Sequence, residues 1–588
     1  MDKQTNTAGG PGKKGWVAPA CIWWITAAFL AFVVVYPSIT LIINSFKTTN
    51  GYSLQNYVTV FQSPSIVESM LNSLKVVIPS TIFATIIGVF LAWAVVRTNV
   101  PGKRYWQTLL AIPYFIPPFI GAIAWTFLLG PVGYFNKLAM SLTGATQPVF
   151  NVYSLGGMVF VMSIYRYAVP FLVVLPTMRK ISASVEEAAR ISGASPWRTL
   201  RDITLPLITP SIAGAMLLLF MFVLADFGVS AVLGAPNQIR LMTTQIFYLV
   251  NRPDMENNLQ IAAAYAIFLS VFGLVGLVLY NRVLKTNKYV VVSGKSAQVE
   301  PTRLGKSKWV LFAFLLVFFL FTTCAPVMAT LITALTKTYG LPFGVAGNIT
   351  LKNFAQLVKI QNIARAFRNS IILSTSSALV ITVVTLIIAY IAIRGGVRGV
   401  RGIGFMQTMV TLPYALPGTI IALAMILAFA KPLPVTGLKL YGTFWILEVA
   451  YIARFMNLGY NNISGAISQI DPSLEEASRI SGATPLRAFR DIMLPLLNTS
   501  LVSSFFLVVA PTLSEITLSS LLWSVKNETI GTVVYSSQEE GKILRTASLA
   551  IVLIVLIVLI NLVVQHIGDR QAGVRKVKKT RKAVGEGS

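Results

Sequence analysis

The chain has 588 residues, of which 55% are hydrophobic and only 12% are charged. This composition excludes an ordinary soluble protein and indicates one whose surroundings are largely lipid. The formal net charge of +28 does not indicate nucleic-acid binding. Most Lys and Arg residues lie in short segments that flank apolar runs, as they do in the cytoplasmic loops of membrane proteins.

Cysteine and histidine are scarce. Cys21 and Cys324 lie inside apolar segments, and His566 is the only histidine. These numbers argue against a disulfide framework, a zinc site and His-based catalysis. We therefore expect no catalytic residue, identify no metal ligands and expect no cofactor in this chain.

Windows of about 20 apolar residues predict six membrane spans in each half of the chain. The first run is too long for a signal-peptide core and is expected to be retained. The expected fold class is therefore an all-α membrane protein with about 12 transmembrane helices. The approximate limits are 17–45, 70–96, 107–130, 153–176, 208–233 and 260–284, then 309–336, 370–393, 403–430, 441–465, 499–524 and 547–567.

These spans divide the chain into two expected repeats, 1–284 and 309–568. A polar, basic linker, 285–308, joins them, and a basic tail, 569–588, follows. Because basic residues gather on alternate connections, the positive-inside rule places both termini and the linker in the cytoplasm. One outer connection, 337–368, is also basic, so the rule holds only for the sum of the loops.

The two halves repeat each other in sequence. Leu-Gln-Asn-Tyr at 54–57 corresponds to Leu-Lys-Asn-Phe at 351–354, and Asn-Ser at 72–73 corresponds to Asn-Ser at 369–370. Because each half has an even number of spans, both halves enter the membrane in the same sense. We expect a pseudo-two-fold axis along the membrane normal, with the transport pathway between the halves.

A polar connection, 184–206, joins the fourth and fifth spans of the first half. Ser184 and Glu187 have the spacing of a capping box at a helix start, and Gly193 suits the turn that ends that helix. Ser195-Pro196 then begins a second helix, which we expect to end at Pro206. The pattern predicts a helix, a glycine turn and a helix, an arrangement that we call the elbow.

The second half contains the same elbow at 473–495. Ser473 and Glu476 repeat the capping-box spacing, Gly482 repeats the turn, and Thr484-Pro485 repeats the second start. Pro495 is expected to end the second helix. A rigid polar elbow of this kind is a surface that a soluble partner could grip.

Both elbows resemble the coupling-loop motif of the membrane subunits of binding-protein-dependent ABC importers. The shared pattern is Glu-Ala-Ala, three residues, Gly, nine residues and Ile-x-Leu-Pro, and the second copy departs from it only at Ser478. The resemblance implies that each elbow docks on one of two cytoplasmic ATPase subunits. The residues expected to couple to the ATPases are Glu186, Glu187, Ala188, Ala189, Gly193, Pro206, Glu475, Glu476, Ala477, Gly482 and Pro495.

The chain has no ATPase motif of its own. Two Gly-Lys-Ser triplets begin at Gly294 and Gly305, but Tyr289 and Glu300 stand where the phosphate loop requires another glycine. ATP and Mg are therefore expected on the partner chains. The resemblance also implies an extracytoplasmic substrate-binding protein and a location in the bacterial inner membrane.

Four ionisable residues lie inside apolar spans, where charge is costly and often functional. Asp226 and Glu515 occupy equivalent positions, and Arg166 and Arg454 are nearly equivalent. Acids facing the axis would favour a cation, whereas arginines would favour an oxyanion. The alternative is that these residues pair within the membrane or reach towards an interface and take no part in the pathway.

Clustered prolines interrupt the third and ninth spans. Proline lacks an N–H donor and disrupts the helix one turn before it, so we expect kinks or breaks here. The alternative is a role in opening the pathway. The residues are Pro113, Pro117, Pro118, Pro413 and Pro417.

The segments that begin at Pro117 and Asp226 resemble the fused permeases of ferric-iron importers. Relatives of those permeases carry 2-aminoethylphosphonate, phosphorylated sugars or thiamine. Ferric iron is the first expectation because it suits Asp226 and Glu515, and a phosphonate is the alternative because it suits the two arginines. A different class, a carrier driven by an ion gradient, shares the twelve-span parallel architecture but has no need of paired elbows.

Overall fold

The computed structural model describes residues 20–181, 188–189, 191–252, 254–286, 302, 304–341, 347–394, 403–433, 437 and 439–585. Within these residues the chain is almost wholly helical. The strands described are the short antiparallel pair β1 (Lys47–Thr48) and β2 (Gly51–Tyr52). The expected all-α membrane fold is confirmed.

In the first half, the helices begin with a long segment that is interrupted by one π-helical turn. The elements are α1 (Ala20–Leu30), η1 (Ala31–Val35), α2 (Tyr36–Phe46), α3 (Gln55–Gln62), α4 (Pro64–Arg97), α5 (Lys103–Leu109), α6 (Ile112–Phe115), α7 (Pro118–Leu129), α8 (Tyr134–Thr143), α9 (Leu155–Arg166), α10 (Ala168–Lys180), α12 (Pro196–Thr199), η2 (Leu200–Thr204), α13 (Leu205–Leu224), α14 (Gly228–Gly234), η3 (Ala235–Asn237), α15 (Met242–Val250) and α16 (Asn258–Thr286).

The second half follows a similar order. The elements are α17 (Ser307–Phe319), η5 (Leu320–Cys324), α18 (Ala325–Ala334), α19 (Lys352–Lys359), α20 (Gln361–Arg394), α21 (Ile403–Ala415), α22 (Gly418–Phe429), α23 (Phe444–Ser468), α24 (Ser473–Ile480), α25 (Pro485–Ala488), η6 (Phe489–Met493), α26 (Leu494–Leu513), α27 (Ser519–Leu522), α28 (Ile530–Glu539) and α29 (Ile543–Gly585). The single helices α21 and α23 stand where the first half has two helices each.

Among the described residues, ten helical segments are long and apolar enough to span a membrane, and the bent pair α21 and α22 makes an eleventh. The twelfth expected span is α23, a helix of 25 residues that does not qualify as apolar. It contains Glu448, Arg454 and several asparagines. Because α23 packs between α20 and α26, protein rather than lipid covers much of it.

The proline clusters break the third and ninth spans, as expected. Ile116 has extended backbone between α6 and α7, and Pro117 and Pro417 are also non-helical, with ψ of 129° and 140°. The chain bends by 113° between α21 and α22. Proline disfavours helical backbone in the residue before it and removes a helix hydrogen bond, which explains breaks at these positions.

The prolines at the starts of α13 and α26 have a different effect from the one expected. Pro206 and Pro495 do not end a helix, because the chain continues helically from α12 through α13 and from α25 through α26. Instead, a π-helical turn precedes each proline. The proline ring displaces the carbonyl four residues earlier, and a wider turn accommodates it. Similar π turns precede Pro37 and Pro326 in the first spans of the two halves.

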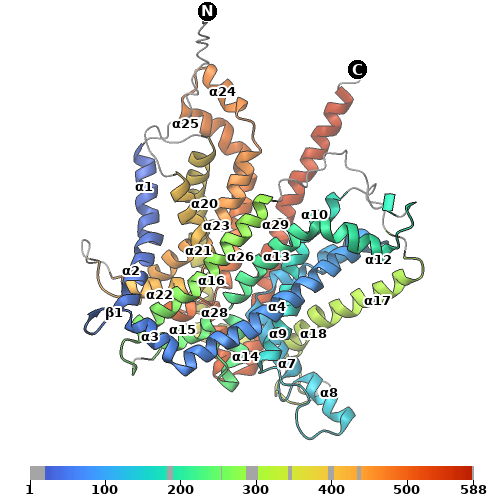
Figure 1. Cartoon of the computed structure of the whole chain (residues 1–588), viewed down its shortest axis with the longest axis vertical. Helices are drawn as coiled ribbons and strands as arrows, with labels where there is room; N and C mark the ends of the chain where they lie inside the picture. The colour runs from blue at the N-terminus through green and yellow to red at the C-terminus, as the bar shows by residue number, and fades with distance from the viewer. Residues whose placement is uncertain are drawn as a thin grey trace, which may run out of the picture.

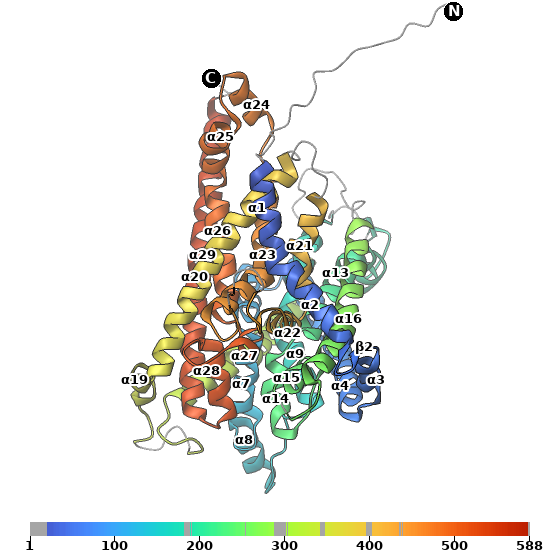
Figure 2. The same ribbon diagram turned by 90° about the vertical axis from the view of Figure 1, so that its left-hand side faces the viewer.

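The first span of each half packs against the other half. α2 contacts α22, and its counterpart α18 contacts α7. Ring pairs repeat this exchange: the centroids of Phe32 and Phe429 are 5.3 Å apart, and those of Phe321 and Trp125 are 5.2 Å apart. The halves therefore interlock, with α1 and α2 lying beside α21, α22 and α23 (Figures 1 and 2).

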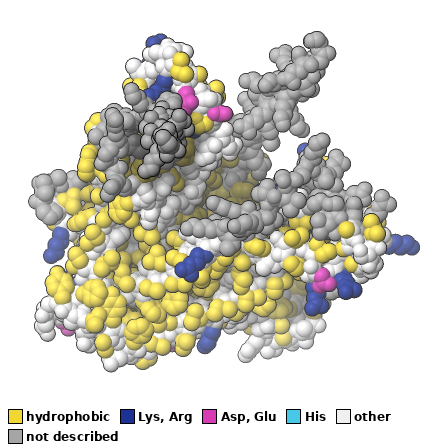
Figure 3. Space-filling view, turned by 45° about the horizontal axis from the view of Figure 1, so that its top comes forward, with side chains coloured by type: hydrophobic (Ala, Val, Ile, Leu, Met, Phe, Trp, Pro, Cys, Tyr) yellow, Lys and Arg dark blue, Asp and Glu magenta, His cyan; other side chains and the backbone are white. Residues whose placement is uncertain are grey.

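The surface agrees with a membrane setting. Figure 3 shows hydrophobic side chains across most of the described surface on one face, with only a few acidic side chains visible. Large apolar side chains are exposed along several spans, among them Ile86 on α4 (60% exposed) and Val317 on α17 (64% exposed). Contiguous apolar surface of this extent suits contact with lipid.

Candidate functional site

The second elbow is described completely. α24 ends in a turn at Gly482, whose φ is +87°, and α25 begins immediately after Thr484. The Ala483 N–H donates to the Ser478 carbonyl at 3.1 Å, and the Arg487 N–H donates to the Thr484 hydroxyl at 3.3 Å. The glycine closes the first helix and the threonine caps the second, so the expected helix–turn–helix is present. Figure 2 shows α24 and α25 projecting at one end of the molecule.

The start of α24 corrects one expectation. Ser473 is the first residue of the helix and does not cap it with its side chain. Its backbone N–H donates instead to the Asp471 carboxylate at 2.9 Å. This hydrogen bond, with a further one from the Ser473 side chain, lowers the pKa of Asp471. Asp is as good a capping acceptor as Ser, and it lies two residues nearer the preceding span.

The first elbow shows the same turn in its described part. Gly193 has φ of +83°, the Ala194 N–H donates to the Ala189 carbonyl at 2.9 Å, and the Arg198 N–H donates to the Ser195 hydroxyl at 3.3 Å. Ala188 is exposed and Ala189 is half-buried. Ser184, Glu186 and Glu187, to which we assigned capping or coupling roles, lie outside the described residues.

An isoleucine stands exposed at the same position in both elbows. The side chains of Ile191 and Ile480 are each 88% exposed, and Leu486 beyond the second turn is 70% exposed. Glu476 and Ala477 are also exposed on α24. Sequence reasoning missed these apolar side chains, although their matched positions in the two motifs were a usable signal. An exposed apolar residue rimmed by polar ones is typical of a protein-binding surface.

Glu475, the residue before Glu476, is buried, whereas a docking residue is expected to be exposed. It is 9% exposed and is turned into the permease, where it pairs with Arg394 at the end of α20 at 2.9 Å. Tyr390 on the same helix donates its hydroxyl hydrogen to the second carboxylate oxygen of Glu475 at 2.5 Å. Glu475 therefore holds the elbow to a span, while Glu476 faces outward.

Arg166, the last residue of α9, and Asp226, two residues beyond the end of α13, form an ion pair at 2.5 Å. The Asp226 side chain is only 5% exposed, and its other oxygen accepts the Val229 N–H at 2.8 Å. Asp226 thus neutralises an arginine and caps α14 where the fifth span is interrupted. In the first half, therefore, the two charged residues pair with each other, which is one of the two arrangements that the sequence left open.

The second half arranges the same charges differently. Glu515 accepts the backbone N–H groups of Leu518 and Ser519, at 2.9 and 3.0 Å, and thereby caps α27. Arg454 is within electrostatic range of Glu515 and donates to the Leu416 carbonyl at 3.4 Å. A Cβ atom at Gly418 would lie 2.7 Å from Nη1 of Arg454, so glycine leaves room for the guanidinium.

Two tyrosines join these arginines. Tyr414 lies within electrostatic range of Tyr114, Arg166 and Arg454, and its ring centroid lies 6.1 Å from that of Phe222 on α13. Tyr114 is 52% exposed. The repeated Pro-Tyr pairs were visible in the sequence, but they predicted helix breaks and not a polar cluster. The cluster brings together residues from both halves.

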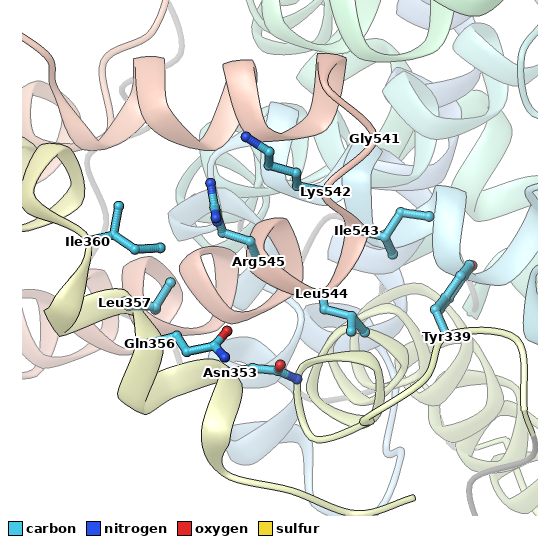
Figure 4. A pocket seen from close by; sticks show the side chains of 10 residues that line it. All are labelled: Tyr339, Asn353, Gln356, Leu357, Ile360, Gly541, Lys542, Ile543, Leu544 and Arg545. Carbon is cyan, nitrogen blue, oxygen red and sulfur yellow. The ribbon is translucent and has the colours of Figure 1, made fainter.

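A separate cavity of about 400 Å³ lies between α19 and the start of α29. Figure 4 shows its lining, with Lys542 and Arg545 on one side and Leu357 and Ile360 on the other. It lies at the end of the molecule opposite α24 (Figure 2), away from both the elbow and the central cluster. Among the residues that the structure describes, no group of three or more His, Cys, Asp or Glu side chains could hold a metal ion.

Comparison with known proteins identifies the family. The family described as "Binding-protein-dependent transport system inner membrane component" matches residues 84–288 and 392–573, one match in each half. Each match contains one elbow and one half of the central cluster.

Individual relatives agree with this match. The chain is 26% identical over 508 residues to the putative ferric transport system permease protein FbpB 1 of Haemophilus influenzae, with 85% of this chain and 76% of the relative covered. It is 26% identical over 511 residues to the ferric transport system permease protein FbpB of Actinobacillus pleuropneumoniae, with 85% and 70% covered. A shorter match, 27% identical over 192 residues, is the molybdenum transport system permease protein ModB of Escherichia coli, with 32% and 82% covered.

Among solved structures, the chain is similar to one in a bacterial alginate ABC transporter in complex with an alginate pentasaccharide-bound periplasmic protein. The identity is 24%, the match covers 47% of this chain and 95% of the other, and the TM-score is 0.39. The family matches together cover more than half of the residues. The chain therefore belongs to the family of inner membrane components of binding-protein-dependent transport systems, and it carries the family's unit twice in one multi-pass membrane polypeptide.

Proposed function

We propose that this chain is the permease of an ATP-driven importer that moves ferric iron into the cytoplasm. The observation that carries the proposal is the alignment with ferric transport system permeases over 85% of the chain, through both repeats. The iron is cargo delivered by an extracytoplasmic binding protein. The chain itself contributes a pathway and no catalytic group.

Each elbow docks on one of two cytoplasmic ATPase subunits, which bind ATP and Mg. The exposed Ile191 and Ile480 support this role, because they offer the same apolar anchor at two matched places. The outward Glu476 adds a charge beside the second anchor. In this proposal the elbows and both termini lie in the cytoplasm, and the binding protein docks at the opposite end of the molecule.

Transport then proceeds by alternating access between the halves. Because the first span of each half packs on the other half, closure of the ATPase subunits acts on both halves together. The cluster of Tyr114, Tyr414, Arg166 and Arg454 joins the halves where the pathway is expected. Asp226 and Glu515 hold the interrupted fifth spans that border this cluster.

The test uses the permease co-purified with its ATPase and reconstituted in lipid. Its binding protein is loaded with either ferric iron or 2-aminoethylphosphonate, and ATP hydrolysis is compared with that given by the unloaded protein. Stimulation by the iron-loaded protein alone supports ferric import. Stimulation by the phosphonate-loaded protein alone overturns the choice of cargo and leaves the importer assignment intact.

An oxyanion is the second candidate cargo, and one observation favours it. Asp226 pairs directly with Arg166, whereas Glu515 directs its carboxylate to backbone N–H groups and forms no direct ion pair with Arg454 within the described residues. A guanidinium without a carboxylate partner attracts phosphonates and similar anions. For this cargo, Arg454→Gln would abolish stimulation by the phosphonate-loaded protein.

A further inference from the structure

The end of α20 is connected to the second elbow through a buried polar network. Arg394 and Glu475 form an ion pair, with Nε of Arg394 2.9 Å from Oε1 of Glu475, and the Tyr390 hydroxyl donates to the other carboxylate oxygen at 2.5 Å. The side chains of Arg394 and Glu475 are only 9% and 12% exposed, and Tyr390 is 3% exposed. Charge-assisted hydrogen bonds withdrawn from water are stronger and more directional than those at a surface.

The same network reaches two more elements. Arg394 also donates to the carbonyls of Ile467 and Ile470, at the end of α23. The Tyr390 ring packs on Phe489, in the π turn that leads into α26, with ring centroids 4.8 Å apart. The Glu475 carboxylate contacts only α20, but its two partners on that helix also contact the end of the span before the elbow and the π turn that leads into the span after it.

The first half repeats part of this arrangement. Arg97 is 2% exposed and donates to the carbonyls of Met178 and Ile181, at 2.8 and 3.2 Å. These carbonyls lie 289 residues before those that Arg394 contacts, which is the offset of the elbows. Trp93, in place of Tyr390, offers no hydroxyl. Both halves therefore have a buried arginine that donates to two carbonyls at the end of the fourth span, but only the second half has a tyrosine at the matching position.

We infer that Glu475 is a positioning residue that transmits movement of the elbow to α20, α23 and α26, and that it does not itself contact the ATPase. This inference rests on the proposed docking of the ATPase at the elbow. Glu476, the next residue, faces outward and is the docking acid. Of these two adjacent acids, Glu476 therefore attaches the ATPase, and Glu475 transmits movement of the elbow to the spans.

The test compares Glu475→Gln with Glu476→Gln in the reconstituted complex of permease, ATPase and binding protein. Both changes remove one charge and keep the side-chain size. For Glu475→Gln, we expect full co-purification of the ATPase, continued ATP hydrolysis and a drop of about tenfold or more in substrate moved per ATP. Tyr390→Phe, which removes only the hydroxyl, should lower the same ratio by a smaller factor.

For Glu476→Gln, we expect the reverse: less ATPase co-purifies, but the complex that remains moves the usual amount of substrate per ATP. If Glu475→Gln reduces co-purification as much as Glu476→Gln and leaves the ratio unchanged, Glu475 is a docking residue and the inference is wrong. A lower melting temperature with an unchanged ratio would also overturn it, because it would reveal a purely structural role.

A second measurement does not depend on the cargo. Val132, just before α8, and Val525, between α27 and α28, are exposed, and Figure 2 shows these helices away from α24. Spin labels at these two positions follow nucleotide-driven separation of the halves after Cys21 and Cys324 are replaced by Ser. With Glu475 intact, bound nucleotide should shift the label distance; with Glu475→Gln, the shift should be lost while the ATPase stays bound. An unchanged shift overturns the inference even if the cargo proves not to be iron.

Discussion

At the scale of single residues, the charges within the spans have specific local partners. Asp226 holds Arg166 and caps α14, and Glu515 caps α27. Each acid lies where the fifth span of its half is interrupted, so free backbone N–H groups are available to it. Sequence position identified the four charged residues, but it could not show which of them would pair. That outcome depends on helix breaks and side-chain directions, which set the distances.

The buried ion pair makes a prediction about stability. Asp226→Asn keeps an acceptor for the Val229 N–H but leaves Arg166 without a carboxylate, and this should cost about 3–5 kcal/mol in the free energy of unfolding. Thermal unfolding of the purified permease measures the change. Asp202→Asn is the control, because its pair with Arg198 is exposed at 3.5 Å. The control should change stability by less than about 0.5 kcal/mol. Equal melting temperatures for the two variants would contradict the account.

The exposed isoleucines make a prediction about binding. Ile480→Ser should weaken attachment of the ATPase by about 2 kcal/mol or more, as expected for a central apolar anchor, and Ile191→Ser should act similarly at the other elbow. Pull-down of the ATPase at graded concentrations measures the loss. Val358→Ser, on α19 at the opposite end of the molecule, removes a similarly exposed apolar group and should leave binding unchanged. Undiminished binding by the Ile191 and Ile480 double variant would rule out these residues as anchors.

At the scale of elements, the elbows were the most predictable part of the chain. Gly482 and Gly193 adopt the positive φ that the helix–turn–helix pattern requires, because this conformation is easy only for glycine. The cap at Asp471 and the π turns before Pro206 and Pro495 were not predicted. Both depend on local competition for hydrogen bonds: Asp471 competes with Ser473 as a cap, and a proline can either end a helix or widen it.

The turn at Gly482 makes a prediction that distinguishes backbone strain from a steric clash of the new side chain. A Cβ atom at Gly482 would meet nothing within 4 Å, so only the backbone conformation opposes substitution. Gly482→Val should cost about 1–2 kcal/mol locally and detach the ATPase, whereas Gly482→Asn should retain it, because asparagine tolerates left-handed backbone. Co-purification measures both variants. Loss of the ATPase with both, or with neither, would contradict the role of the turn.

The cap at Asp471 makes a prediction about pH. Because folding lowers the pKa of Asp471, the cap stabilises α24 above the unfolded pKa, near 3.9, and this stability is lost as the pH falls through the lower, folded value. Hydrogen exchange in α24, corrected for intrinsic rates, should be constant from pH 5 to 8 and faster in strong acid. Asp471→Ala should show the faster exchange at every pH. Wild-type protection in that variant would exclude the cap.

At the scale of the whole molecule, the internal repeat was the feature most accessible from sequence. Matched motifs predicted two repeated halves, and the two family matches confirm the repeat. The exchange of first spans between the halves could not be predicted, because apolar helices carry little information about their neighbours. The sequence also did not show that α23 would be too polar to count as a lipid-facing span. Its charged residues Glu448 and Arg454 are tolerated because other helices cover them.

The measurement that tests the central claim most directly is the energy source of uptake. Proteoliposomes that contain the permease, its ATPase and the iron-loaded binding protein are assayed for iron entry with ATP and a collapsed membrane potential, and then with the potential and no ATP. The account predicts entry in the first case and none in the second. Entry driven by the potential without ATP would contradict it and favour a carrier driven by an ion gradient.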